Sequence, residues 1–353
     1  MAQKKRNINI EILRTLSMFM IVVLHFLNYG KVLESVKGGF SFVNFYAFLI
    51  EALCIVAVNV YILISSYFLY EKKFQMKRII RVLCEVWIYS ILIGIVGMIL
   101  GWIPFSISNL IHILFPILLQ QYWFVNAYIM LLFLIPFFNP FVKTLSKKRH
   151  SILLILLLIF NSIIPLFTKS AVSLTTGNSL TWFVNLYLIA SYFKKYPVTI
   201  SSKYFLLIYI GTSFLLALSA LVVLDQFGFG KALHFYKYNS ILVLLSSLSL
   251  FLIFLKPKKI SEKIEKIILF FSSSTFAVYI LHENYFLRNL IWNKWVSLSP
   301  TFTICIGTLS LIGICLLIFI LSILIDKVVG RLIHKISIPM PKIDQILNEE
   351  SAK

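Results

Sequence analysis

The stretch from Asn9 to Asn28 reads NIEILRTLSMFMIVVLHFLN, an apolar segment whose ionisable side chains are Glu11, Arg14 and His25. An α-helix needs about 20 such residues to cross the hydrocarbon core of a bilayer. The stretch therefore predicts a transmembrane helix. Apolar runs of similar length recur along the rest of the chain.

The composition points the same way. Of the 353 residues, 60% are hydrophobic and 13% are charged, against about 45–50% and about 25% in soluble domains. A water-soluble globule could not bury so much apolar surface. The composition excludes a soluble enzyme, a disordered protein and a disulfide scaffold, and it predicts an all-α polytopic membrane protein.

The apolar runs and their breaks predict a bundle of about ten transmembrane helices in a single domain, 1–353. The spans cover roughly 9–326, and 327–353 is predicted to be a cytoplasmic tail. A further apolar stretch, 109–119, is too short to cross and is predicted to be re-entrant or interfacial. The predicted spans are 9–29, 42–70, 80–100, 121–142, 151–168, 180–193, 203–224, 239–255, 267–287 and 301–325.

The basic residues predict the topology. Of the 33 lysines and arginines, 25 fall on one side of these spans and seven on the other, and Arg14 lies inside the first span. Cytoplasmic loops carry such an excess, so both termini are expected in the cytoplasm. The net charge of +20 is thereby explained by topology and contact with membrane lipids, and no nucleic-acid partner is expected.

Arg14 and His25 are candidates for a functional pair. They are eleven residues apart, which is about three helical turns, so both face the same side at a separation of about 16 Å. Such a polar stripe lines a bundle interior or a cavity, and imidazole is a suitable proton acceptor near neutral pH. Alternatively, Arg14 reaches the inner headgroups and His25 bonds a neighbouring helix.

Arg78 and Arg81 form a second candidate site, since residues at i and i+3 share one helix face. Paired guanidinium groups suit phosphate oxygens. The alternative is that they set the topology and contact anionic lipids, with Glu85 as the partner of Arg81.

Four further ionisable or amide side chains lie within predicted spans. His282 and Glu283 come near the outer end of span 267–287, at a depth comparable with His25, and are either catalytic or an interfacial polar terminus. Glu51 and Asn59 in span 42–70 either pair within the bundle or line the path of a substrate.

Four stretches, taken in order, resemble the integral-membrane acyltransferase-3 family, which O-acylates surface carbohydrates. Ser66 departs from the glycine usual in that family. The stretches are Arg14 with His25; Ser65-Ser66-Tyr67 followed by Arg78 and Arg81; Trp123 to Tyr128 continuing to Pro136; and Tyr279 to His282.

The resemblance implies a membrane O-acyltransferase, most often an O-acetyltransferase, that uses acyl-CoA as donor and no metal. The acceptor would be a hydroxyl of a cell-surface or lipid-linked polysaccharide. Glu283 and Asn284 after His282 resemble a variant from capsule and exopolysaccharide members, which implies the plasma membrane of a Gram-positive bacterium.

With the resemblance, the candidate residues take expected roles. Arg78 and Arg81 would hold the donor's phosphates, and Arg14 would steer the donor inward. His25 would be the general base on the acceptor hydroxyl or would carry the acyl group itself. The residues expected to orient the substrate are Trp123, Tyr128, His282, Glu283, Glu51 and Asn59.

Two other functions remain open from the sequence. The bundle could export a polysaccharide or a lipid-linked sugar, with His25 and Arg14 along the translocation path. It could also anchor a glycan-assembly complex. Acyl-CoA hydrolysis or acetyl transfer by the purified protein in nanodiscs would favour the enzyme. Unchanged glycan acetylation with lost surface export after deletion would favour the transporter.

Overall fold

The computed structural model describes residues 7–36, 39–167, 177–257, 260–295, 304–333 and 341–349. In these residues every regular element is helical, as the composition predicts. The helices are α1 (Ile8–Tyr29), α2 (Phe42–Cys54), α3 (Ala57–Leu69), α4 (Met76–Ile99), α5 (Ile107–Leu114), α6 (Trp123–Thr144), α7 (Lys147–Leu158), η1 (Ile159–Ile163), α8 (Ile164–Phe167), α9 (Leu180–Lys195), α10 (Ser202–Phe227), α11 (Phe229–Ala232), η2 (His234–Tyr236), α12 (Ile241–Leu255), α13 (Glu262–Ser272), α14 (Thr275–His282), α15 (Tyr285–Asn289), η3 (Leu290–Trp295), α16 (Ile304–Ile333) and α17 (Pro341–Glu349).

Within the described ranges, seven helical spans are long and apolar enough to cross a membrane, or eight if the bent pair of Phe229–Tyr236 and Ile241–Leu255 counts as one. The chain is therefore a multi-pass membrane protein. The predicted spans 151–168 and 180–193 correspond to shorter helices, α7 to α8 and α9; residue 168 lies outside the described residues. The count of about ten and the side on which the termini lie stay predictions.

Two predicted spans contain breaks. Span 42–70 is interrupted at Ile55 and Val56, between α2 and α3, and the helix over 262–282 is interrupted at Ser273 and Ser274. The break at Ile55 is important for the site, because it directly follows the turn that carries Glu51.

The stretch 109–119 forms α5 over part of its length, and this helix of eight residues is too short to cross. It packs on α4, where Ser90 donates a hydrogen bond to the carbonyl of Ile113 over 2.8 Å. A Cβ at Gly94 would lie 2.5 Å from Cδ1 of Ile113. Glycine is therefore required for this close approach.

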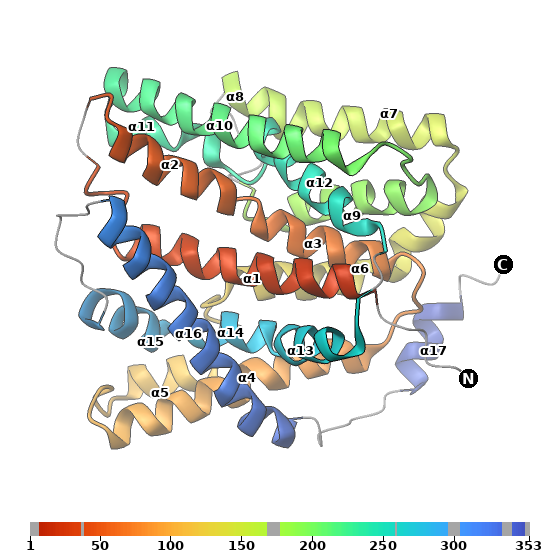
Figure 1. Cartoon of the computed structure of the whole chain (residues 1–353). Helices are drawn as coiled ribbons and strands as arrows, with labels where there is room; N and C mark the ends of the chain where they lie inside the picture. Colours follow the sequence, from red (N-terminus) through yellow and green to blue (C-terminus); the bar gives the residue numbers. More distant parts are fainter. Residues whose placement is uncertain are drawn as a thin grey trace.

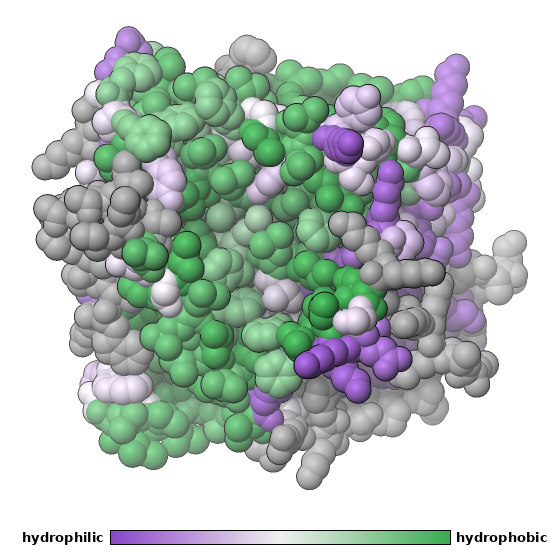
Figure 2. All heavy atoms as spheres, in the orientation of Figure 1, coloured by the Kyte–Doolittle hydropathy of each residue, from purple (hydrophilic) through white to green (hydrophobic). Residues whose placement is uncertain are grey.

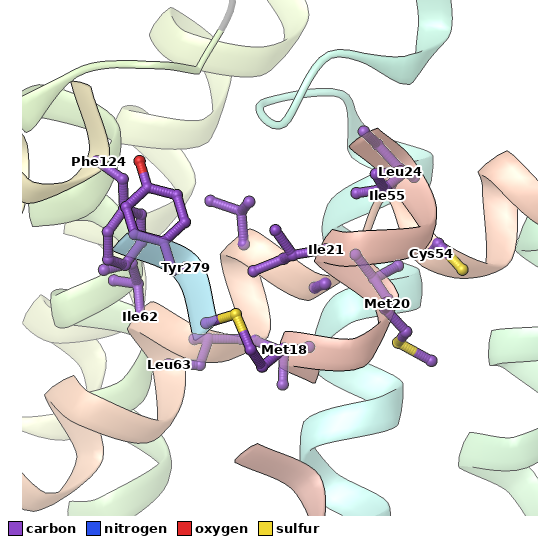
Figure 3. Packing of buried hydrophobic residues seen from close by; sticks show 14 of the residues in the cluster. Met18, Met20, Ile21, Leu24, Cys54, Ile55, Ile62, Leu63, Phe124 and Tyr279 are labelled. Atoms are coloured by element: carbon purple, nitrogen blue, oxygen red, sulfur yellow. The ribbon is translucent and has the colours of Figure 1, made fainter. Parts of the chain in front are cut away.

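Helix α1 lies in the middle of the bundle and packs against α2, α3, α13, α14 and α16 (Figure 1). Asn7 caps its first turn through a side-chain hydrogen bond to the amide of Asn9. Leu13, Val22 and Phe26 are fully buried on it. Figure 3 shows the apolar side chains of α1 meeting those of α2, α3 and α14 in this core. A central α1 places its few polar groups in the protein interior instead of in lipid.

Charged side chains gather at one end of the bundle, which we call the basic end. It is the end where α1 and α4 begin and where α3, α6, α9 and α12 finish (Figure 1). Figure 2 shows the hydrophilic residues concentrated along this edge and a mostly apolar surface beside it. The exposed Lys72, Lys148 and Arg149 belong to it. We call the opposite end the far end.

Helix α16 continues to Ile333, past the predicted end of the spans at 326. Within the predicted tail, α17 docks at the basic end. The Asn348 amide group exchanges two hydrogen bonds with the backbone of Phe74, at 3.0 and 3.1 Å. The tail therefore includes a helix that is attached to the bundle.

Candidate functional site

A cavity of about 410 Å³ opens among α1, α2, α3, α6, α14 and the segment before α12. We call it the catalytic cavity, after the role that we propose for it. On α1 it extends from Tyr29 to Met18, with His25 and Asn28 between them. Met18, Ile21 and Leu24 form an apolar wall together with Ile55 from the break after α2 (Figure 3). Polar groups from several helices thus share one space with an apolar wall.

His25 is hydrogen-bonded to a second histidine across the bundle. Its Nδ1 lies 2.8 Å from Nε2 of His282, the last residue of α14. Nδ1 of His282 lies 2.5 Å from the carbonyl oxygen of Val278, one turn earlier. A carbonyl only accepts, so Nδ1 of His282 donates and its Nε2 accepts from His25. This order leaves Nε2 of His25 as an unprotonated base for a substrate.

Glu283 adds a carboxylate to the histidine pair. Its Oε2 lies 3.3 Å from Nδ1 of His25. Its Oε1 accepts hydrogen bonds of 3.1 Å from both Tyr29 and Arg288. Burial lowers the pKa of Arg288, but Glu283 and Tyr29 outweigh it, so the net shift is upward and the guanidinium stays charged. The arrangement orients a base and places a negative charge where an imidazolium would form.

Glu51 brings a second carboxyl group to the cavity. It is 3% exposed, and its Oε1 accepts a 3.1 Å hydrogen bond from Asn28, one turn beyond His25 on α1. Its Oε2 has no hydrogen-bond partner among the described residues, and the same holds for the buried hydroxyl of Tyr279. Both side chains line the cavity. Buried polar atoms without partners are costly, so the cavity is suited to a ligand that carries hydroxyl groups.

One wall of the cavity is aromatic. Trp123, the first residue of α6, stacks on Tyr238 with 5.8 Å between ring centroids and 25° between planes. Asn59 lies behind this wall, fully buried and outside the cavity lining. Its amide donates to the carbonyl of Tyr238 over 2.8 Å and accepts from Nε1 of Trp182 over 2.9 Å. Asn59 therefore supports the wall from behind, whereas Trp123 lines the catalytic cavity.

Arg14 does not line the catalytic cavity, which ends at Met18, one turn away. Its Nη1 donates to Oε2 of Glu11 over 2.8 Å. Tyr61 lines the cavity, Tyr128 does not, and the charge of Arg14 acts on both phenols. The shared face of Arg14 and His25 is present, but the cavity does not join them.

Arg78 and Arg81 differ in their surroundings. Arg78 is half-buried and its charge acts on Tyr128, as that of Arg14 does, whereas Arg81 is exposed and lies near Glu85. Asp344 of α17 accepts a 2.6 Å hydrogen bond from the amide of Met76, at the start of α4. An anion already occupies the first turn of α4, which is where a phosphate would also bind.

Sequence reasoning did not single out Tyr29, Tyr238 or Arg288. Tyr29 is four residues after His25, so helical spacing could have placed it on the same face. Arg288 counted only as a topological charge, and Tyr238 is in an irregular segment without periodicity. In the described part of the chain, no group of three histidine, cysteine or acidic residues could hold a metal ion.

One comparison with known protein families found a match. A family model described as an acyltransferase domain matches residues 7–325, nearly the whole chain. No curated protein and no solved structure matches the chain. The matched range contains the histidine pair, both carboxylates and the arginines of the basic end. The chain belongs to the acyltransferase-3 family and is a membrane acyltransferase.

Proposed function

We propose that the protein is an O-acyltransferase that moves an acyl group from cytoplasmic acyl-CoA to a hydroxyl of a cell-surface or lipid-linked polysaccharide. We take the acyl group to be acetyl, which makes the protein an O-acetyltransferase. The observation that carries this proposal is the network of His25, His282 and Glu283 beside a cavity with unsatisfied polar groups.

In the proposed reaction, each member of this network has one role. Nε2 of His25 takes the proton of the acceptor hydroxyl while its oxygen attacks the thioester carbonyl carbon. The carbon–sulfur bond breaks, and the imidazolium returns the proton to the leaving thiolate, which gives free CoA and an ester. Glu283, 3.3 Å from Nδ1 of His25, stabilises the imidazolium between these steps. His282 fixes the tautomer of His25.

The donor would enter at the basic end. The charges of Arg78 and Arg14 both act on Tyr128, so they would attract the phosphates and guide the acyl arm toward Tyr61. Because the cavity ends at Met18, the aromatic side chains Tyr61 and Tyr128 have to move apart for the thioester to reach His25. While they are closed they keep bulk water from the reactive ester.

The acceptor would enter the catalytic cavity from the far end. The Trp123 and Tyr238 rings offer an apolar platform for a sugar face, and Oε2 of Glu51 and the Tyr279 hydroxyl offer partners for sugar hydroxyl groups. A translocation path for export would have to continue past Met18, which the cavity does not do. The structure therefore gives no specific support to the exporter.

The first test is His25→Ala in purified protein reconstituted in nanodiscs with acetyl-CoA and cell-envelope glycan. General-base catalysis contributes about 10²- to 10⁴-fold, so transfer should fall by at least that factor. His112→Ala is the matched control, since His112 lies on α5 outside the catalytic cavity. Size-exclusion profiles of both variants should match the parent.

Normal acetylation by a correctly folded His25→Ala protein would contradict the mechanism. Unchanged glycan acetylation together with lost surface export in a deletion strain would favour the transporter instead.

A further inference from the structure

A second cavity, larger than the first, is formed by α4, α16 and the segment from α14 to η3. We call it the lateral groove. It has a volume of about 790 Å³ and is lined almost wholly by apolar side chains. Val96, Leu317 and Leu321 line it and are about half exposed, at 47%, 57% and 48%. Because these exposed side chains belong to spanning helices, the groove opens sideways to the lipid chains.

The lateral groove leads to the histidine pair. His282 is one of its lining residues, and the same imidazole is bonded to His25 of the catalytic cavity. A hydrocarbon chain in the groove therefore lies directly behind the proposed base. Such a chain gains little net free energy by leaving lipid for an apolar groove. The groove instead acts by positioning: it fixes the depth in the membrane, and the orientation, of the polar group that the hydrocarbon chain carries.

A third cavity of about 170 Å³, which we call the polar vestibule, borders residues of the other two. It shares Asn289 with the lateral groove and shares Asn28 and Tyr29 with the catalytic cavity. The three cavities thus follow one another around the far end of α1. Their lining changes from apolar, through polar, to aromatic and carboxyl-bearing.

Two cationic side chains line the polar vestibule, those of Lys31 and Arg288, together with Asn28, Asn289 and Asn293. The Asn28 amide already donates to the Leu24 carbonyl and to Glu51, so the cations and the remaining amides are the available donors. Trp292 is 1% exposed, and its Nε1 has no hydrogen-bond partner in the described part of the chain. The acids nearby are the exposed Glu34 and, beyond the vestibule, Glu283, which is bound to Arg288. An acceptor-only anion such as a phosphate fits these donors.

We propose that the acceptor is a lipid-linked saccharide phosphate whose single hydrocarbon chain lies in the lateral groove. Its phosphate lies in the polar vestibule, and its sugar lies on Trp123 and Tyr238 within reach of His25. The assignment rests on the proposed function, and it narrows the acceptor to a membrane-anchored amphiphile. A free polysaccharide would need neither an apolar groove nor an anion site between that groove and the base.

The test uses a photoreactive hexadecyl phosphate, with hexadecanol carrying the same photoreactive group as the uncharged reference. The full chain is placed in phosphatidylcholine nanodiscs, and labelled peptides are mapped by mass spectrometry. Charge-assisted hydrogen bonds favour the phosphate probe, so labelling of α4 and α16 in the groove should exceed that by hexadecanol about tenfold.

Two double variants on α16 separate the groove from the general lipid surface. Leu317→Trp with Leu321→Trp fills the groove and should lower labelling by the phosphate probe about tenfold. Leu316→Trp with Ile320→Trp is the matched control, because these neighbours are exposed but do not line the groove. The control pair should label as the parent does.

Trp292→Phe removes the indole N–H with little change of shape, and it should weaken labelling by the phosphate probe but not by hexadecanol. Hexadecyl phosphate should also inhibit glycan acylation competitively against the acceptor and not against acyl-CoA.

Equal labelling by both probes would mean that the groove holds ordinary bilayer lipid, and so would labelling that is unchanged by Leu317→Trp with Leu321→Trp. Either result would overturn the proposal. Labelling without competition against the acceptor would also overturn it. These outcomes are separate from a failure of the proposed function, which the His25→Ala experiment detects.

Discussion

Glu283 is a residue whose charge acts on a neighbour instead of on the substrate. Its Oε1 is held by Tyr29 and Arg288, and its Oε2 lies 3.3 Å from Nδ1 of His25. A neutral His25 needs no counter-charge, whereas an imidazolium formed during transfer does. The contribution of Glu283 should therefore be greatest in the transition state.

Glu283→Gln should lower kcat and leave the KM for the acceptor unchanged. Close charge pairs couple by about 1.5 kcal/mol or more, which corresponds to a loss of at least roughly tenfold. Initial rates in nanodiscs measure it. Glu71→Gln, on an exposed carboxyl bound to Lys194 at the basic end, should keep parental rates. A raised KM with normal kcat for Glu283→Gln would mean that Glu283 binds substrate.

Arg78 and Arg81 are equivalent by spacing but not by position. Arg78→Ala should raise the KM for acyl-CoA, because its guanidinium is half-buried and its charge, like that of Arg14, acts on Tyr128. One charge-assisted contact of about 1.5–3 kcal/mol predicts roughly a tenfold rise or more. Arg81→Ala should change KM less, since Arg81 is exposed near Glu85. Equal effects of the two variants on KM would contradict the distinction.

At the scale of elements, Asn59 joins three parts of the bundle. Its amide connects α3 to Trp182 of α9 and to the carbonyl of Tyr238, with Ser247 of α12 as a weaker contact at 3.3 Å. Tyr238 in turn stacks on Trp123. A residue outside the cavity thus holds one of its walls in place.

Asn59→Ala should destabilise the protein by roughly 2 kcal/mol, since interhelical hydrogen bonds in membranes average about 0.6 kcal/mol each. It should also raise the KM for the acceptor, because Tyr238 loses its anchor. Thermal melting and acceptor titration measure the two effects. Thr212→Val is the control, as Thr212 bonds only carbonyls of its own helix. Reduced stability with an unchanged KM would assign Asn59 to folding alone.

At the scale of the whole molecule, the proposed function depends on which end faces the cytoplasm, because the proposed donor, acyl-CoA, is made there. The concentration of charge at the basic end (Figure 2) and the excess of basic residues in alternate loops both favour a cytoplasmic basic end. The donor would then enter beside Arg78, and the catalytic cavity would face the acceptor on the other side.

Cysteine labelling checks this orientation. Lys231→Cys on α11 at the far end should react with a membrane-impermeant maleimide in intact cells, and Lys148→Cys at the basic end should react only after permeabilisation. Both lysines are exposed, and the unsubstituted protein gives the background. The opposite pattern would reverse the topology and place the arginines on the wrong side for acyl-CoA.

The sequence alone determined that the chain is helical and embedded in a membrane, because the length and polarity of each apolar run are local properties. Nearly every predicted span has a helical counterpart, and the short 109–119 stretch is indeed too short to cross. Their position inside predicted spans also singled out His25, His282, Glu283 and Glu51, since ionisable groups are costly inside a bilayer.

Only the tertiary structure decided which of these groups meet. His25 and His282 are 257 residues apart in the chain, and no local pattern records a contact over that distance. The structure also shows that Arg14 does not line the cavity and that Asn59 lies behind the aromatic wall. It further shows that Tyr29, Arg288 and Tyr238 belong to the site. The physical reason is that burial fixes a helix face, whereas the partner on that face depends on how the other helices pack around α1.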